Sequence, residues 1–281
     1  MIPGEFDYTA PDSIDGALAA LGEGGEDAKL LAGGHSLIPL MKLRVAFPSL
    51  LVDLRNVAEL RGVDREDGNW LIGPMTRHAD LQANRDLGVI AEAAGLIADQ
   101  QVRNRGTIGG AIAHGDMAGD LPAVLLATDG TVTAQGRSGT REIAAADLFQ
   151  DYLTTALGPD EMITEIRMPV LDGWGYGYQK FTRRAEDWAM VGVCALVKRA
   201  GDGSCEDVRI GLTNMGATPL RALAAEEALR GGSLEADPIA RAADQAAEGA
   251  DPPADLNASS EYKRHLARVL CRRALERAAA G

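Results

Sequence analysis

The sequence predicts an α+β protein in which two small α/β units precede a domain made of an antiparallel sheet and helices. Short apolar runs alternate with helix-like segments over residues 13–169, three strand-like runs follow over residues 176–213, and Ala, Arg and Glu dominate residues 219–279. Alternating strands and helices favour α/β units, whereas strands followed by helices favour a separate α+β unit. At 281 residues, the chain has room for two domains.

The first unit, residues 1–57, is expected to alternate helices with strands. Ser13 is a typical N-cap residue, and apolar residues recur after it at helical spacing. Two short apolar runs, which end at Ala32 and Asp53, have the length of buried strands. The predicted order is helix, strand, helix, strand, over residues 13–21, 29–32, 36–43 and 50–53.

The second unit, residues 58–173, is expected to contain strands towards both ends and helices between them. Thr76 is placed to cap a helix that ends at Leu81. Asp120 is a candidate N-cap for another helix, with Pro122 tolerated in the first turn. The predicted strands cover residues 70–72, 131–134 and 162–168, and the predicted helices cover residues 76–81, 87–98 and 120–128.

The third unit, residues 174–281, is expected to be a three-stranded antiparallel sheet with helices. Gly173, Gly175 and Gly177 mark its start. The run Asp251-Pro252-Pro253 interrupts the helical pattern that follows the strands. The predicted strands cover residues 176–181, 190–197 and 208–213, and the predicted helices cover residues 219–229, 237–250 and 260–279.

Composition argues against several classes of protein. A formal net charge of −13 does not suit a protein that binds nucleic acid or an anionic membrane surface. The three cysteines, Cys194, Cys205 and Cys271, are scattered, and they are too few to ligate an iron–sulfur cluster. No stretch has the character of a signal peptide or of a membrane span. We therefore expect a protein of the reducing cytoplasm, without a disulfide framework.

Two glycine-rich loops carry the strongest functional signal. The first is Ala32-Gly33-Gly34-His35-Ser36, and the second is Thr107-Ile108-Gly109-Gly110-Ala111. Glycine has no Cβ, so the backbone N–H groups of such loops can approach an anion closely. Two converging loops can hold a diphosphate from both sides, which points to a dinucleotide cofactor. The alternative is that both loops are only turns, because neither the G-x-G-x-x-G nor the Walker pattern is present.

The loops and their neighbours resemble the flavin subunits of molybdenum hydroxylases, the xanthine dehydrogenase family. Within that family the resemblance is greatest to the medium chains of aerobic carbon monoxide dehydrogenases. The segments that carry it span almost the whole chain: Pro3–Tyr8, Glu59–Val63, Gln101–Asn104, Gly119–Pro122, Asp160–Ile166, Tyr178–Phe181, Asp187–Ala189, Ile210–Asn214 and Ser260–Lys263.

The resemblance implies an FAD-binding fold of the vanillyl-alcohol oxidase / p-cresol methylhydroxylase type, in which two subdomains hold FAD and the C-terminal domain covers it. It also implies an electron-transfer role, from [2Fe-2S] clusters on a small partner chain to an external acceptor such as a quinone. Molybdopterin is expected on a large partner chain that oxidises the substrate. The expected assembly is a dimer of heterotrimers in the cytoplasm. The inner face of the membrane is a site where this complex can associate.

The resemblance assigns roles to single residues as well. The two glycine loops become the diphosphate site, where His35 is expected to contribute its backbone and Ser36 either its hydroxyl or a helix cap. Asp120, otherwise a helix cap, is expected to contact the cofactor. Lys180, otherwise a surface residue, is expected near the flavin ring, where a cation would stabilise a reduced, anionic flavin. Further cofactor contacts are expected from Ile97, His114, Asp116 and Ile163, although both isoleucines also suit a plain core.

No residue of this chain is expected to act as a catalytic acid, base or nucleophile, because no Ser-His-Asp, Cys-His or paired-carboxylate constellation is recognisable. His114 and Asp116 lack the further ligands of a zinc or iron site, so no metal is expected. Three alternatives stay open. The chain can serve a hydroxylase of N-heterocycles (nicotine, caffeine or xanthine-like) or of aldehydes, it can be a free-standing FAD oxidoreductase, or it can be a non-enzymatic scaffold.

Overall fold

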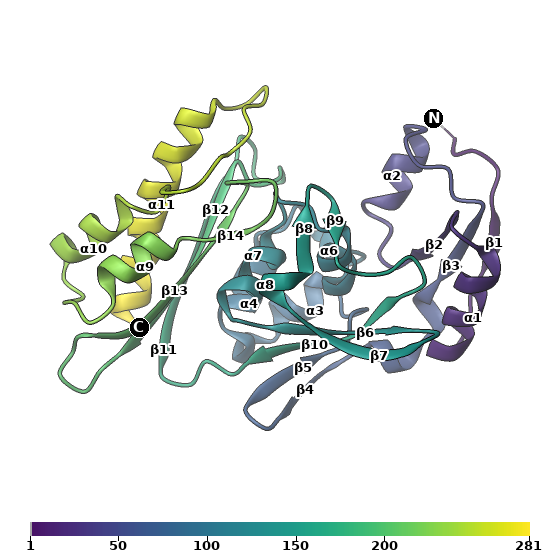
Figure 1. Ribbon diagram of the computed structural model, residues 1–281, viewed down its shortest axis with the longest axis horizontal. Coiled ribbons are helices and arrows are strands. Elements are labelled where there is room, and N and C mark those ends of the chain that lie inside the picture. Colours follow the sequence, from purple (N-terminus) through teal and green to yellow (C-terminus); the bar gives the residue numbers. More distant parts are fainter. Residues whose placement is uncertain (1) are drawn as a thin grey trace.

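The computed structural model describes residues 2–281, which form three main sheets arranged one after another along the molecule (Figure 1). The first sheet and the C-terminal sheet with its helices lie at opposite ends, and a five-stranded sheet lies between them. No helix in this described part of the chain is long and apolar enough to cross a membrane.

The first sheet has three parallel strands in the order β1-β3-β2. Ser13 caps the first helix as predicted, since its hydroxyl accepts a hydrogen bond of 3.2 Å from the Gly16 amide. Because the strands are parallel, they all end at one edge of the sheet, where the first glycine loop leaves β2. The elements in chain order are β1 (Asp7–Thr9), α1 (Ile14–Gly24), β2 (Ala28–Leu31), α2 (Leu37–Lys42) and β3 (Leu50–Asp53).

The middle sheet is antiparallel and has the strand order β4-β5-β10-β6-β7. Five of its helices, α3 to α7, lie between β5 and β6, whereas α8 and a small hairpin, β8–β9, follow β7. The strands are β4 (Val63–Glu66), β5 (Asn69–Ile72), β6 (Thr131–Gly136), β7 (Gly139–Ala144), β8 (Phe149–Asp151), β9 (Thr154–Thr155) and β10 (Met162–Pro169). The helices are α3 (His78–Ala83), α4 (Val89–Gly95), α5 (Gln100–Arg103), α6 (Ile108–His114), α7 (Asp120–Ala127) and α8 (Ala145–Leu148).

The C-terminal sheet is antiparallel in the order β11-β12-β13-β14 and is covered on both faces. Successive residues of a strand point to opposite faces. Cys194 and Leu196 accordingly join the core around α4 and α7, whereas Val193 and Ala195 join the core beneath the C-terminal helices. The elements are β11 (Trp174–Phe181), β12 (Val191–Arg199), β13 (Cys205–Thr213), β14 (Leu220–Arg221), α9 (Leu223–Leu229), α10 (Ala236–Ala243) and α11 (Ser260–Ala280).

Three predictions for the second unit are wrong. Thr76 caps no helix, because its hydroxyl exchanges hydrogen bonds of 2.9 and 3.2 Å with the backbone of Gly62. The helix predicted over residues 87–98 covers only Val89–Gly95, and Gly88, with φ of 55°, separates it from the preceding turn. Asp120 is not an N-cap: Gly119 takes that position, and the Asp120 side chain bonds to residues far along the chain.

The C-terminal domain also departs from its prediction. Residues 219–222 precede α9 instead of belonging to it, and Leu220–Arg221 adds a fourth strand to the sheet. The helix predicted over residues 237–250 ends at Ala243. Gly175 and Gly177 lie inside β11, where a Cβ at either position would collide with a backbone carbonyl of α11. These glycines let the long helix pack closely on the sheet.

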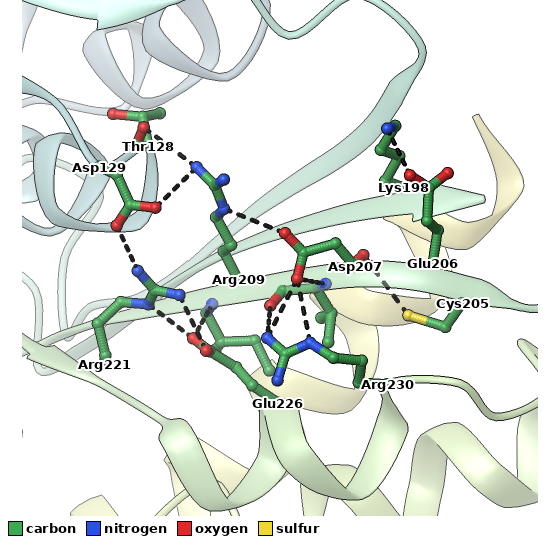
Figure 2. Close-up of polar contacts among 12 residues, drawn as sticks. Thr128, Asp129, Lys198, Cys205, Glu206, Asp207, Arg209, Arg221, Glu226 and Arg230 are labelled. Atoms are coloured by element: carbon green, nitrogen blue, oxygen red, sulfur yellow. Dashed lines mark hydrogen bonds and ion pairs between the residues drawn. The ribbon is translucent and has the colours of Figure 1, made fainter. Parts of the chain in front are cut away.

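A partly buried ionic network joins α7 to the C-terminal domain (Figure 2). Asp129, just after α7, pairs with Arg209 of β13 at 2.9 Å and with Arg221 of β14 at 2.7 Å. Arg221 also contacts Glu226 of α9 at 2.6 Å, and Glu226 accepts a further hydrogen bond of 2.7 Å from the Ile210 amide. The Glu226 side chain is only 3% exposed, so its charge depends on these partners.

Replacing Glu226 with Gln should lower the free energy of unfolding by about 3 kcal/mol, because the partly buried Arg221 would lose one of its two carboxylate partners inside the protein. Glu206→Gln is the matched control, since Glu206 forms an exposed ion pair with Lys198 at 2.6 Å, and it should cost no more than about 1 kcal/mol. Urea denaturation followed by circular dichroism measures both. Equal losses in the two variants would contradict this role of Glu226.

Candidate functional site

A cavity of about 600 Å³ lies where all three parts of the chain meet. Its walls come from the end of β2 and the loop after it, from α6 and the start of α7, and from β10 and β11. Fifteen of the sixteen predicted site residues line it: Ala32, Gly33, Gly34, His35, Ser36, Ile97, Thr107, Gly109, Gly110, Ala111, His114, Asp116, Asp120, Ile163 and Lys180.

The first glycine loop presents a row of free backbone donors. Within residues 2–281, none of the five consecutive amide N–H groups of residues 33–37 donates a hydrogen bond. Gly34 has φ of 77°, a left-handed conformation that favours glycine. The N–H groups at the start of a helix such as α2 have no acceptor within the helix, so they are available to a ligand. An anionic group of a ligand is the natural partner for such a row.

Gly33 is required for a different reason than the sequence suggested. A Cβ on Gly33 would collide with the backbone carbonyl of Arg105 and lie 2.8 Å from the Cα of Gly106. The missing side chain therefore lets the first loop pack directly on the segment that leads into the second loop. The two loops converge, as predicted, through a backbone-to-backbone contact at this glycine.

Residues 108–111 of the second loop do not offer the free N–H groups that we expected. Residues 108–114 form α6, which Thr107 caps by accepting a hydrogen bond of 3.2 Å from the Gly110 amide. The amides of Ile108, Gly109 and Ala111 bond to backbone carbonyls at 3.1, 2.9 and 3.0 Å. Ile108 is also fully buried in the core and does not line the cavity. Its prediction as a site residue is not supported by this geometry.

Asp120, Tyr178 and Lys180 form a buried polar cluster, of which Asp120 and Lys180 line the cavity. One carboxylate oxygen of Asp120 accepts a hydrogen bond of 2.6 Å from the Tyr178 hydroxyl, and the other pairs with Lys180 Nζ at 2.8 Å. Lys180 Nζ also donates to the Leu96 carbonyl at 3.0 Å. The side chains of Lys180 and Asp120 are 5% and 4% exposed, so Lys180 is not a surface residue.

Burial dominates the electrostatics of this cluster. It raises the pKa of Asp120 above its ordinary value, and the Lys180 charge and the two hydrogen bonds oppose that rise. Burial and the neighbouring Asp120 also raise the pKa of Tyr178 well above its ordinary value, so its hydroxyl remains a donor. Because Lys180 is paired with Asp120, this part of the cavity is lined by an ion pair and not by the lone cation that we expected.

The remaining predicted residues line the cavity in varied environments. Ser36 makes no side-chain cap, so its hydroxyl is free for a ligand. Burial and the nearby Arg105 lower the pKa of His35. Asp116 accepts a hydrogen bond of 2.8 Å from the Ala118 amide, which shapes the turn between α6 and α7. Within residues 2–281, no three His, Cys, Asp or Glu side chains are grouped so that they could hold a metal ion.

Sequence reasoning missed two polar residues of this region. Tyr178 is two residues from Lys180 in β11, and the period of a strand places both on one face, so the sequence held a signal for it. His78 also lines the cavity, although its Nδ1 is buried without a hydrogen-bond partner among residues 2–281. Burial lowers the pKa of His78 to about 4, and the nearby His35 contributes to a smaller extent. The His78 ring is therefore neutral at neutral pH. The sequence carried no signal for it.

The sequence matches two family models. Residues 4–171 match the FAD binding domain in molybdopterin dehydrogenase, and residues 176–278 match the CO dehydrogenase flavoprotein C-terminal domain. This chain belongs to the FAD-binding subunit family of the molybdopterin dehydrogenases. The resemblance seen in the sequence and the FAD-binding fold that it implied are thereby confirmed. The relatives in this family are oxidoreductase subunits.

Individual relatives match over nearly their full length. The chain is 42% identical to the carbon monoxide dehydrogenase medium chain of Hydrogenophaga pseudoflava, over 99% of this chain and 98% of the relative. It is 40% identical to the alpha subunit of the 6-hydroxypseudooxynicotine dehydrogenase complex of Paenarthrobacter nicotinovorans, over 99% and 96%. The solved carbon monoxide dehydrogenase of H. pseudoflava matches with a TM-score of 0.96 and 44% identity, over 100% and 99% of the two chains.

Proposed function

We propose that the cavity binds FAD, with the diphosphate at the free N–H groups of residues 33–37 and the flavin ring near Asp120 and Lys180. The observation that carries this proposal is the row of five donors without acceptors on the wall of a cavity of about 600 Å³. A diphosphate would supply the missing acceptors without requiring a cationic chain. The site residues fit FAD in this respect, and the family model independently describes an FAD-binding domain.

Bound FAD would supply the redox chemistry, and the protein would bind, orient and tune it. Ile97, Ile163 and Trp188 line the cavity and present apolar surface that suits an aromatic ring. The Asp120–Lys180 pair is held in place by Tyr178 and by the Leu96 carbonyl, so its charges cannot easily reorient. A fixed pair of opposite charges sets the local potential without adding net charge.

We further propose that this chain is the electron-transfer subunit of a molybdenum hydroxylase, assembled as a dimer of heterotrimers in the cytoplasm. A small chain with [2Fe-2S] clusters would deliver electrons, and an external acceptor such as a quinone would receive them. A large molybdopterin chain would oxidise the substrate. The names of the matched relatives, a medium chain and a complex subunit, support such an assembly.

Carbon monoxide is the first candidate substrate of the complex, because the matched medium chain and the matched solved structure are from a carbon monoxide dehydrogenase. An N-heterocyclic compound is the second candidate, because a subunit of 6-hydroxypseudooxynicotine dehydrogenase matches at nearly the same identity, 40% against 42%. The substrate would bind to the large partner chain, so both candidates remain compatible with the cavity described here.

Purified chain freed of flavin should bind FAD at least about 100-fold more tightly than riboflavin, because riboflavin offers no phosphate to the N–H groups of residues 33–37. A ratio of 100 corresponds to about 2.7 kcal/mol, the value of one or two charge-assisted hydrogen bonds. Quenching of flavin fluorescence measures both affinities. Equal affinity for the two flavins would remove the first loop from the diphosphate site.

Substitutions in the ion pair should move the midpoint potential of bound FAD in opposite directions. Asp120→Asn leaves the Lys180 charge uncompensated and should raise the potential, whereas Lys180→Met should lower it. Each shift should be roughly 30 mV or more, since 30 mV equals about 1.4 kcal/mol for a two-electron couple. The double variant serves as the control and should lie near the wild type. Unchanged potentials in both single variants would separate this pair from the flavin ring.

Purification of the chain from its native host should yield two companion chains and a visible spectrum with both flavin and iron–sulfur bands. Activity assays on that complex with carbon monoxide and with N-heterocycles then identify the substrate class. The isolated chain should show no activity with either. A flavin band with no companion chain would favour a free-standing oxidoreductase instead.

A further inference from the structure

A second cavity of about 220 Å³ adjoins the larger one and is lined mainly by polar and cationic side chains. It shares Ala32, Met75 and Thr107 with the larger cavity, so the same loops separate the two. It lies at the carboxyl edge of the first sheet, between the end of β3 and the segments that precede α3 and α6. Its charged lining residues are Asp53, Arg55, Arg61, Arg77 and Arg105.

Most of the positive charge in this arginine cavity is not neutralised by the protein. Asp53 is the one carboxylate in its lining, and it is already engaged by Arg55 at 2.6 Å and by the Tyr8 hydroxyl at 3.0 Å. The side chains of Arg61, Arg77 and Arg105 form no ion pair with any carboxylate within residues 2–281. The only hydrogen bond that any of these three side chains donates there runs from Arg61 to the Arg55 carbonyl, at 2.9 Å.

The arginine cavity gathers four arginines around one carboxylate in a chain whose formal net charge is −13. Arg209 and Arg221, by contrast, each contact two carboxylates. Like charges that line one small cavity repel each other, and the repulsion is relieved when an anion enters. The guanidinium group presents paired N–H donors that match phosphate oxygens.

We propose that the arginine cavity is an anion site, distinct from the FAD site, that binds a small phosphate-class oxyanion of one or two phosphate groups. Its volume of about 220 Å³ is smaller than the roughly 300–1,000 Å³ of pockets that hold drug-sized ligands. Phosphate or pyrophosphate suits this volume better than a whole nucleotide does. The anion would bind to Arg77 and Arg105 together and so link the two different segments from which they come.

The location of the site couples it to the FAD cavity. Arg105 provides the backbone carbonyl against which Gly33 packs, and residues 77 and 107 pair as an isolated antiparallel bridge. An anion held between Arg77 and Arg105 would therefore tie together the segments that position the first glycine loop. Binding of the oxyanion should strengthen FAD retention, and FAD should strengthen binding of the oxyanion by the same factor.

Isothermal titration calorimetry with pyrophosphate and with inorganic phosphate, at constant ionic strength, tests this proposal on the full chain with and without FAD. When FAD is bound, we expect one site per chain, tighter for pyrophosphate. Arg77→Gln and Arg105→Gln should each weaken binding at least ten-fold, and Arg77→Lys should weaken it less than Arg77→Gln. Arg273→Gln, which removes an exposed arginine of α11, is the matched control and should leave the affinity unchanged.

Three results would overturn the proposal. The first is an absence of binding to the chain in either state, as expected if a carboxylate of a partner chain occupies the cavity. The second is displacement of FAD by pyrophosphate, which would assign the arginines to the FAD site. The third is equal binding by wild type and Arg77→Gln when melting temperatures show both to be folded. Pyrophosphate binding by a chain that fails to bind FAD would refute the proposed function and leave this inference standing.

Discussion

The buried carboxylate of Asp120 is the interaction on which the arrangement of this protein depends. It stands at the start of α7, every residue of which is buried. From there it binds Tyr178 and Lys180 of β11, so it joins the middle unit to the C-terminal domain. A buried charge is costly unless it is paired and hydrogen-bonded, and these partners supply both. The cavity exists at this junction because neither unit closes it alone.

The ionic network of Asp129, Arg209, Arg221 and Glu226 complements Asp120 at the other end of α7. Together the two clusters anchor both ends of one helix to one sheet. Asp120 and Lys180 line the large cavity, whereas none of the four residues of the second cluster does. The same kind of interaction therefore serves cofactor tuning at one end of α7, as we propose, and stability at the other.

The two glycine loops illustrate how one residue type serves different physical needs. Gly34 allows a left-handed turn that leaves neighbouring N–H groups free, whereas Gly33 allows the backbones of two loops to touch. Gly109 likewise permits close packing, since a Cβ there would collide with the side chain of Pro74. Only the first loop keeps its donors for a ligand, because the second loop is wound into the capped helix α6.

Local signals in the sequence determined α1, β2, α2 and β3 of the first unit, the three long strands of the C-terminal sheet and the place of the two loops, whereas β1 and β14 were not predicted. Helix caps, apolar periodicity and glycine runs involve only a few neighbouring residues, so they can be recognised in the sequence before the tertiary structure is known. Tertiary structure decided what those signals could not: the pairing of Asp120 with Lys180, sixty positions away, the partners of the second loop's amides, and the neutral, buried His78. Each of these depends on desolvation and on groups distant in the chain, and burial is a property of the folded molecule alone.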